Sequence, residues 1–206
     1  MTQDNTYLRD HGYLYDATTE DPKLTKERAQ VKDLCFEYNY QVRPSETDKQ
    51  QEILSKILGY KGKNISVMSP FWVDYGYNVE FGDYSFANHN LVILDTAKVR
   101  IGKHVFIAAN VHITTAGHPL DPEMRNSGLE YAYPVTIGDN VWIGSNVVIL
   151  PGVTIGSSVV IGAGSIVTRD IPDGVVAVGN PCRVLRALTA EDKKKYQTPP
   201  ACCQRD

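Results

Sequence analysis

Aliphatic residues recur at every sixth position through the C-terminal half of this chain, and this repeat constrains the fold more than any other feature. The period is neither the 3.6 residues of an α-helix nor the 2 residues of a simple strand. It indicates short strands separated by sharp bends, so that three repeats form one triangular coil and the inward aliphatic residues stack from coil to coil. The positions are Ile137, Ile143, Ile149, Ile155, Ile161 and Val167, with Val135, Val141, Val147, Val153 and Val159 two residues earlier.

The same six-residue step occurs earlier in the chain, with a slip of two residues between two sets. Those sets are Phe81, Ala87 and Ile93, followed by Ile101, Ile107 and Ile113. Glycines follow several inward residues, where a bend requires positive φ or a close backbone approach. They are Gly138, Gly144, Gly156 and Gly162. A parallel β-helix explains these observations together, whereas a β-sandwich would not normally hold one period over six repeats.

Composition limits the classes of function that remain. The chain has 206 residues and a net charge of −3, so it offers no general attraction to nucleic acid or to an anionic membrane surface. No apolar run approaches the roughly 20 residues that span a bilayer, and nothing near Met1 resembles a signal peptide, so we expect a soluble, cytoplasmic protein. Four cysteines are few for this length, and we expect free thiols at Cys35, Cys182, Cys202 and Cys203.

The N-terminal residues 1–60 follow a helical pattern instead. Asp21 before Pro22 resembles a helix N-cap, and a 3.6-residue apolar period follows. Ser45–Asp48 resembles a capping box for a second helix, which Gly59 would end. Two short helices cannot bury their own apolar stripes, so we expect them to pack on the following body or on a neighbouring subunit.

Residues 114–134 interrupt the repeat with a polar, turn-rich segment. Ile113 and Ile137 on either side are twenty-four residues apart, a whole number of repeats, so the β-helix can resume in phase. The segment also carries apolar side chains that a purely solvated loop would not need. These are Leu120, Met124, Leu129 and Tyr131. We therefore expect an arm that covers a cleft shared with a neighbouring subunit.

Three stretches carry a family resemblance. They are TIGDNVWIGSNVVILPGVTIGSSVVIGAGSIVTRDIPDGVVAVGNPCRVLR, HPLDPEMR before it and DYGYNVEFGDYSFANHN earlier. They resemble the hexapeptide-repeat sugar O-acetyltransferases, the maltose and galactoside acetyltransferase group. The resemblance implies a left-handed parallel β-helix, an exception to the right-handed crossover rule. It also implies a homotrimer with active sites between subunits and acetyl-coenzyme A as the acetyl donor.

On this basis we predict three segments and one reaction. Residues 1–60 form an N-terminal helical segment, 61–188 form the β-helix acetyltransferase domain with the inserted loop 114–134, and 189–206 form a tail. The reaction is direct transfer of an acetyl group from acetyl-coenzyme A to a sugar hydroxyl. His118, beside a proline at the base of the arm, suits the general base, because imidazole titrates near physiological pH. No Ser or Cys nucleophile is flanked by a convincing histidine, and the resemblance implies no metal.

Polar side chains in family positions are candidates for binding the acceptor sugar, since carboxylates and amides form directional hydrogen bonds to hydroxyl groups. They are Asp16, Asp74, Asn88, Asp95 and Glu130. Asn88 and Asp74 could instead close turns between coils. Galactoside-type members carry Ser where this chain has Asp74, so the resemblance favours glucose or maltose-type acceptors.

The resemblance implies that coenzyme A binds along the side of the β-helix, and the chain has no Walker or Rossmann pattern. The matching positions are Trp142, Ser145, Ala163, Thr168, Arg169, Arg183 and Arg186. Trp142 is unneeded for the core at an outward position and could pack on the pantetheine arm. The arginines could pair with phosphates. Lys193–Lys195 and the residues after them resemble a solvated end.

Two other functions remain open at this point. The β-helix is similar to that of γ-type carbonic anhydrases, which use three histidine ligands across a subunit interface. The histidines that could serve are His89, His104, His112 and His118. The arm, Trp142 and the C-terminal arginines would then have no role. A non-catalytic trimeric scaffold is the second alternative, and it predicts no thermal stabilisation by coenzyme A.

Overall fold

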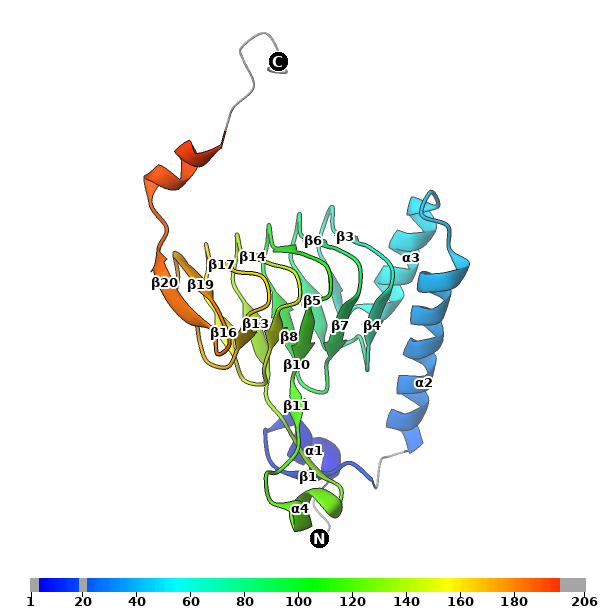
Figure 1. Cartoon of the computed structure of the whole chain (residues 1–206). Helices are drawn as coiled ribbons and strands as arrows, with labels where there is room; N and C mark the ends of the chain where they lie inside the picture. The colour runs from blue at the N-terminus through cyan, green and yellow to red at the C-terminus, as the bar shows by residue number, and fades with distance from the viewer. Residues whose placement is uncertain (1–3, 19–21, 197–206) are drawn as a thin grey trace.

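The computed structural model describes residues 4–18 and 22–196. Its body is a parallel β-helix whose short strands wind into stacked triangular coils (Figure 1). Two helices lie against one end of the stack, and an arm projects from its side. The predicted parallel β-helix is therefore confirmed.

The coils have three faces, each a hydrogen-bonded sheet that we name by one of its strands. The β8 face contains β2 (Tyr60–Lys61), β5 (Val79–Phe81), β8 (Val99–Ile101), β13 (Val135–Ile137) and β16 (Thr154–Ile155). The β9 face contains β3 (Ser66–Val67), β6 (Phe86–Ala87), β9 (Phe106–Ile107), β14 (Trp142–Ile143), β17 (Val160–Ile161), β19 (Val175–Val178) and the antiparallel β20 (Arg183–Ala187). The β10 face contains β4 (Phe71–Val73), β7 (Leu91–Leu94), β10 (His112–Thr114), β15 (Val148–Ile149) and β18 (Ile166–Val167).

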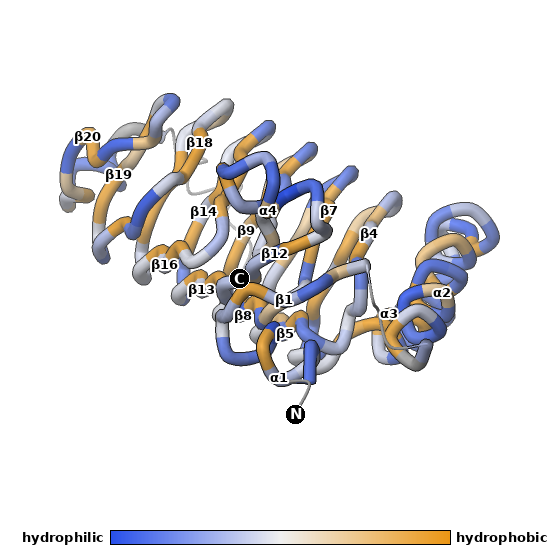
Figure 2. Tube along the Cα trace, turned by 90° about the horizontal axis from the view of Figure 1, so that it is seen from below, coloured by the Kyte–Doolittle hydropathy of each residue, from blue (hydrophilic) through white to orange (hydrophobic). Residues whose placement is uncertain are grey.

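The core is the stack of aliphatic residues that the six-residue period predicted. Strand register places Ile101, Ile137 and Ile155 directly above one another on the β8 face. All three are at most 3% exposed, and equivalent ladders line the other two faces. Figure 2 shows hydrophobic residues along the strands and hydrophilic residues at the bends. Each coil thus buries its apolar side chains only against its neighbours.

The bends use glycine and asparagine in different ways. Gly138 does not have positive φ, and a Cβ placed there would lie 2.7 Å from the backbone nitrogen of Ser157 in the next coil. Close approach between coils is therefore the reason for glycine at this position. Positive φ falls mainly on other residues, which tolerate the left-handed region to different degrees. At the corner between the β8 and β9 faces they are Asn64, Tyr84, His104, Asn140 and Ser158, and at the next corner Asn90, Asn110 and Asn146.

The third corner, between the β10 and β8 faces, is not regular. Inward residues on either side of it are eight residues apart from Val73 to Phe81 and again from Ile93 to Ile101. In the next coil this corner contains the whole arm, residues 115–134. The two-residue slip in the sequence and the long polar segment are thus successive expansions of one corner.

The two longer N-terminal helices close the first coil. They are α2 (Pro22–Phe36), which continues into a π-helical turn η1 (Glu37–Gln41), and α3 (Thr47–Ile57). Leu54 and Ile57 of α3 are buried in the same core cluster as Phe71. The Asn39 side chain in η1 pairs with both backbone groups of Phe71, at 2.8 and 2.9 Å, and so covers the edge strand. The prediction that the helices pack on the body is confirmed.

Three local predictions about these helices need comment. The capping box at Ser45–Asp48 is wrong, because the N-cap of α3 is Glu46, whose carboxylate accepts a hydrogen bond from the Arg43 amide instead. Gly59 does not end α3 with positive φ; it lies against the Tyr77 backbone, where a side chain would not fit. The predicted N-cap Asp21 lies outside the described residues, as do Cys202 and Cys203 in the tail.

The arm is a β-hairpin, and an N-terminal strand pairs with its second strand. It contains β11 (Ala116–Gly117), α4 (Pro122–Asn126) and β12 (Leu129–Ala132), and β12 pairs on its other side with β1 (Tyr15–Asp16). The short helix α1 (Asn5–Asp10) precedes β1 and packs beside the base of the arm (Figure 1). At the other end, the 3₁₀ helix η2 (Ala190–Lys195) follows β20.

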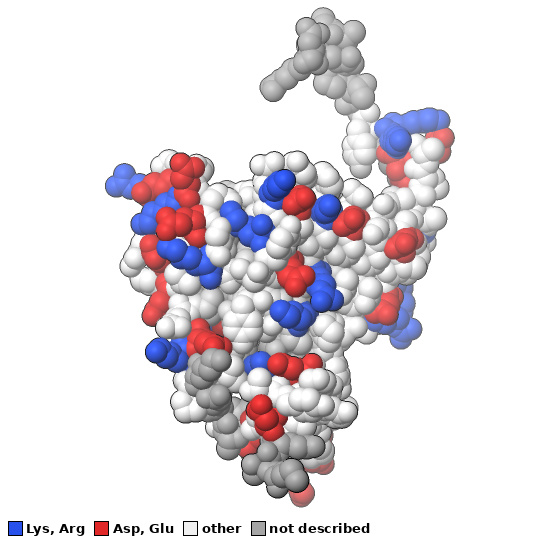
Figure 3. All heavy atoms as spheres, turned by 180° about the vertical axis from the view of Figure 1, so that it is seen from behind, with Lys and Arg blue, Asp and Glu red and all other residues white. Residues whose placement is uncertain are grey.

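The surface shows no strong charge asymmetry on the face drawn in Figure 3, where acidic and basic side chains intermingle. Cys35 and Cys182 are buried free thiols. Within residues 4–18 and 22–196, no helix has the length and apolar character needed to cross a bilayer.

Candidate active site

A cavity of about 180 Å³ lies where α1, β1 and the arm meet the third corner. We call it the first cavity. Glu130 comes from the arm, Asp16 from β1 and Thr96 from the corner itself. Pairing of β1 with β12 places Asp16 opposite Leu129 and Tyr15 opposite Glu130. Two predicted acceptor-binding residues, Asp16 and Glu130, are therefore brought together by an antiparallel pairing across more than a hundred residues of sequence.

His118 lies near the base of the arm, directly after β11, and its side chain is 56% exposed. Its Nε2 lies 3.9 Å from Oε1 of Glu130. The other carboxylate oxygen of Glu130 accepts a hydrogen bond of 2.6 Å from the Tyr15 hydroxyl. Tyr15 is buried, and burial together with the Glu130 contact raises the pKa of its hydroxyl. A buried phenol therefore holds the carboxylate that faces the histidine.

Asp74 follows β4 at the first expansion of the third corner. Burial raises the pKa of its carboxyl, and the positive charges of Lys32 and Arg28 on α2 oppose that effect. The Lys32 Nζ lies 3.7 Å from Oδ1 of Asp74. The negative charge of Glu130 adds a small contribution to the raised pKa of Asp74. The side chain remains 25% exposed and can reach a ligand.

Asp95, also predicted to bind the acceptor, has a completely buried side chain in the single chain. Its Oδ1 accepts hydrogen bonds from the backbone amides of Asp74, at 2.8 Å, and Tyr75, at 2.9 Å. Its Oδ2 has no hydrogen-bond partner among the described residues. Asp95 thus supports the backbone of the corner and positions Asp74, and a direct contact of its Oδ2 with the acceptor stays a prediction.

Asn88 lies away from the first cavity. It follows β6 at the second corner, between the β9 and β10 faces, whereas the arm leaves the far edge of the β10 face. Its Oδ1 accepts a hydrogen bond of 2.7 Å from the His89 amide, as a turn-closing residue does. Within one chain the structure does not bring Asn88 to His118.

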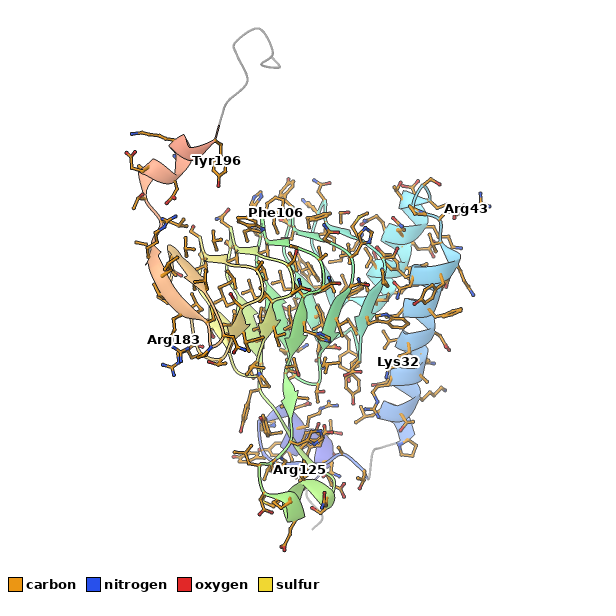
Figure 4. All side chains as sticks on the ribbon, viewed as in Figure 1. Lys32, Arg43, Phe106, Arg125, Arg183 and Tyr196 are labelled. Atoms are coloured by element: carbon orange, nitrogen blue, oxygen red, sulfur yellow. The ribbon has the colours of Figure 1, made fainter. Side chains whose placement is uncertain are left out.

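The predicted donor-binding residues fall into separate groups. Trp142 is 53% exposed on the β9 face and pairs with Phe106, at the opposite edge of the β-helix from the arm residue Arg125 (Figure 4). Ser145 and Ala163 lie at the second corner beside it, after β14 and β17. Thr168 and Arg169 follow β18 at the third corner. These groups flank the β10 face rather than line one pocket of a single chain.

The two remaining arginines lie on β20, at the C-terminal end of the stack (Figure 4). Arg183 donates a hydrogen bond of 2.7 Å to the Cys182 carbonyl. Arg186 donates two hydrogen bonds of 2.8 Å to the Asp192 carboxylate of η2. The Arg186 guanidinium is thus already engaged, and a phosphate would have to compete with that carboxylate.

Sequence reasoning missed several residues that line the first cavity. Arg9, Tyr15, Arg28 and Thr96 all contribute to it. Arg9 is 5% exposed, and its guanidinium lies 5.3 Å from the centre of the Tyr75 ring. A charged residue in the first helix, before any repeat begins, carries no periodic signal. Only the pairing of β1 with β12, which the sequence does not reveal, makes it a cavity residue.

The carbonic anhydrase alternative needs a group of histidines around a metal ion. In the part of the chain that the structure describes, no three His, Cys, Asp or Glu side chains are grouped so that they could hold one. His104 stacks on Tyr84 instead, with ring centroids 5.1 Å apart. The histidines of one chain therefore do not assemble a metal centre by themselves.

The six-residue repeats of this β-helix place the chain among the hexapeptide-repeat transferases. The bacterial transferase hexapeptide family model matches residues 134–169, and the maltose acetyltransferase hexapeptide capping motif matches residues 11–62. The galactoside O-acetyltransferase of Escherichia coli is 47% identical over 84% of this chain and 85% of its own length. This chain belongs to the maltose and galactoside O-acetyltransferase family of acyltransferases.

Solved structures agree with that assignment. A maltose O-acetyltransferase from Clostridium difficile superposes with a TM-score of 0.87 and 46% identity, over 92% of this chain and 100% of its own. A galactoside acetyltransferase in complex with coenzyme A gives a TM-score of 0.90 and 43% identity, over 96% of this chain and 97% of its own.

Proposed function

We propose that the protein transfers the acetyl group of acetyl-coenzyme A to a hydroxyl of a glucose, maltose or galactoside-type sugar, with His118 as the general base. The family relatives act on maltose and galactosides, and one of them binds coenzyme A. The observation that carries the proposal is the position of His118 on the arm. Its Nε2 lies 3.9 Å from Glu130, a carboxylate that lines the first cavity and accepts a hydrogen bond from the buried Tyr15.

The reaction needs one proton transfer and one acyl transfer. A ring nitrogen of His118 takes the hydroxyl proton as the sugar oxygen attacks the thioester carbonyl. The carbon–sulfur bond then breaks, and the imidazolium returns the proton to the thiolate of coenzyme A. The Glu130 carboxylate stabilises the imidazolium between these steps. Asp16, which lines the first cavity, and Asp74, directly after β4, bind and orient the hydroxyl groups of the acceptor.

We further propose that the working form is a homotrimer. Apart from Tyr60, outward residues on the β8 face are polar and include the Glu80–Arg100 ion pair, whereas those on the β9 and β10 faces include Phe106, Trp142 and Val148. Two adjacent apolar faces and one polar face suit a ring of three chains that leaves the β8 face open. A neighbouring chain in such a ring could supply Asn88 and Trp142 to the arm.

The direct test is His118→Ala, assayed for release of coenzyme A thiol with glucose, maltose and a galactoside. General-base catalysis contributes about 10²–10⁴-fold, and we expect a loss of that size with the assembly state unchanged. An intact variant that retains near-complete activity would refute the assignment of the base.

The donor site is tested separately with Trp142→Ala. We expect the KM for acetyl-coenzyme A to rise while the KM for the sugar stays constant, because the indole is 53% exposed and unneeded for the core. Protection of the wild-type chain against thermal unfolding by coenzyme A would oppose the scaffold alternative.

A further inference from the structure

A second cavity, of about 720 Å³, lies on the other side of Arg9 from the first. Arg9 lines both cavities, so they are immediate neighbours. The second cavity is enclosed by the C-terminal end of α1 (Arg9 to Gly12), by the third corner and by the base of the arm. None of the residues assigned to catalysis, acceptor binding or donor binding above lines it.

The expansions of the third corner build this cavity. Tyr77 and Asn78 come from the first eight-residue step, Ala97 and Lys98 from the second, and residues 132–134 from the base of the arm. A regular six-residue corner has no room for these residues. Three successive coils therefore each depart from the six-residue repeat at the third corner, and the extra residues form the wall of the cavity.

The exposed lining has the chemistry of a carbohydrate site. Tyr77 is 39% exposed and Tyr133 is 42% exposed, and aromatic rings pack well against the C–H faces of a pyranose. Tyr133 is held in place by stacking on Tyr131, with ring centroids 4.9 Å apart. Asp10 and Lys98 supply hydrogen-bonding groups of both signs at the same cavity.

Arg9 supplies an unused donor between the two cavities. Its side chain is 6% exposed, and its Nε and Nη2 are directed to Asp10 at 2.9 Å. Its Nη1 is buried without a hydrogen-bond partner among the described residues. Native proteins rarely leave a buried charged donor unpaired. Where one is found, a ligand or a water molecule often accepts the missing hydrogen bond.

We propose that the second cavity binds a second sugar unit of an oligosaccharide acceptor, while the unit that is acetylated occupies the first cavity. The inference rests on the proposed function and adds the class of acceptor: a glycoside or oligosaccharide in preference to a free monosaccharide. The adjoining β8 face carries the exposed Glu80–Arg100 ion pair and the outward Thr136, so a longer saccharide can continue across polar side chains.

The test compares glucose, maltose and maltotriose as acceptors in Tyr133→Ala, Lys98→Ala and the wild-type protein. In the wild type we expect kcat/KM to be higher for maltose than for glucose. In Tyr133→Ala the value for maltose falls by about tenfold while that for glucose stays within about twofold, since an aromatic platform serves only the second unit. Lys98→Ala gives a smaller change in the same direction, and because Lys98 is exposed it does not threaten folding.

Tyr60→Ala is the matched control, because Tyr60 is a 55% exposed tyrosine of the β8 face that lines neither cavity. Tyr60→Ala should leave kcat/KM unchanged for both glucose and maltose. Equal loss for glucose and maltose in Tyr133→Ala, or no preference for maltose in the wild type, would overturn the second site. If no sugar is acetylated at all, the proposed function fails; calorimetric binding of maltotriose and glucose then decides the second site, which is refuted if maltotriose binds no more tightly.

Discussion

Two corners of the β-helix differ in a way that separates folding from function. The corner between the β9 and β10 faces keeps one pattern through successive coils, with Asn90, Asn110 and Asn146 in the left-handed conformation. The corner between the β10 and β8 faces departs from the six-residue step in three successive coils and carries both cavities. The regular corner preserves the stack, while the irregular one provides room for polar groups that no core residue requires.

The physical reason lies in where each side chain points. At a regular corner only three residues separate the inward positions of the flanking strands, as between Ile143 and Val147, so both inward positions stay filled and no chain is left to vary. Extra residues at the third corner leave the core ladder intact, since Ile101, Ile137 and Ile155 remain stacked. The additional chain therefore adds surface without removing buried apolar area.

The largest predicted effect comes from making the irregular corner regular. We would replace residues 115–134 with Pro-Gly, copying the turn at Pro151 and Gly152, so that Ile113 and Ile137 become six residues apart. Acetyl transfer should fall below detection, because His118 and Glu130 are removed together. Cooperative thermal unfolding should persist, measured by circular dichroism. Residual sugar acetylation by a folded variant would contradict the assignment of catalysis to the irregular corner.

A smaller effect is expected for Tyr15→Phe. The substitution removes the 2.6 Å hydrogen bond to Glu130 but keeps the buried ring, so kcat should fall by about tenfold, or about 1.4 kcal/mol in activation free energy, with little change in KM for the donor. Tyr13→Phe, at a 58% exposed position, is the control. Unchanged kcat in Tyr15→Phe would show that the carboxylate does not depend on this contact.

Asp95 should affect stability more than chemistry. Asp95→Ala leaves the Asp74 and Tyr75 amides without their acceptor, which costs about 1–3 kcal/mol for each buried group, whereas Asp95→Asn keeps an acceptor oxygen and costs less. Urea unfolding measures the difference. Equal losses in the two variants would mean that the amide contacts contribute nothing.

The same residue gives a pH dependence with a definite sign. Burial raises the pKa of Asp95, although the backbone amides oppose this. The folded state then holds the proton more tightly than the unfolded state, so this contribution to stability is full at low pH and is lost as the pH rises through the raised pKa. The stability of Asp95→Asn relative to wild type should therefore improve as the pH rises above about 4, the ordinary aspartate range. A pH-independent difference would contradict this.

The smallest effect is expected at a regular corner. Asn64 has φ of 53°, so Asn64→Ala should reduce the free energy of unfolding by about 1 kcal/mol, and Asn64→Gly by less, with kcat and KM unchanged for both. A change in acetyl transfer without a change in stability would place function at the regular corners as well.

The sequence was most informative where one physical rule acts on every repeat. The six-residue period predicted the inward stack residue by residue, because each coil must bury an aliphatic group against the next. It also located the arm, since the polar segment breaks that rule. The burial of Asp95 was not predicted, because it depends on how two expanded corners fold over each other, which no periodicity encodes.

The candidate site was only partly predictable for a related reason. Glu130 and Asp16 were named by resemblance, but their meeting depends on β1, a two-residue strand that is too short to show a pattern. Arg9 and Tyr15 precede the repeats and enter the cavity only through that pairing. The second cavity has no motif at all, since it arises from the extra residues of three separate coils.

The arm closes on itself before it returns to the coil. The Tyr133 amide donates to the Thr115 carbonyl at 2.8 Å, and Ala116 pairs with Ala132 just beyond. With its ends fastened together, the length of the hairpin is independent of the pitch of the solenoid. Homologous chains can therefore lengthen, shorten or exchange the hairpin, and so change which acceptor hydroxyl is bound. The residues proposed to bind acetyl-coenzyme A lie on the coils and need not change.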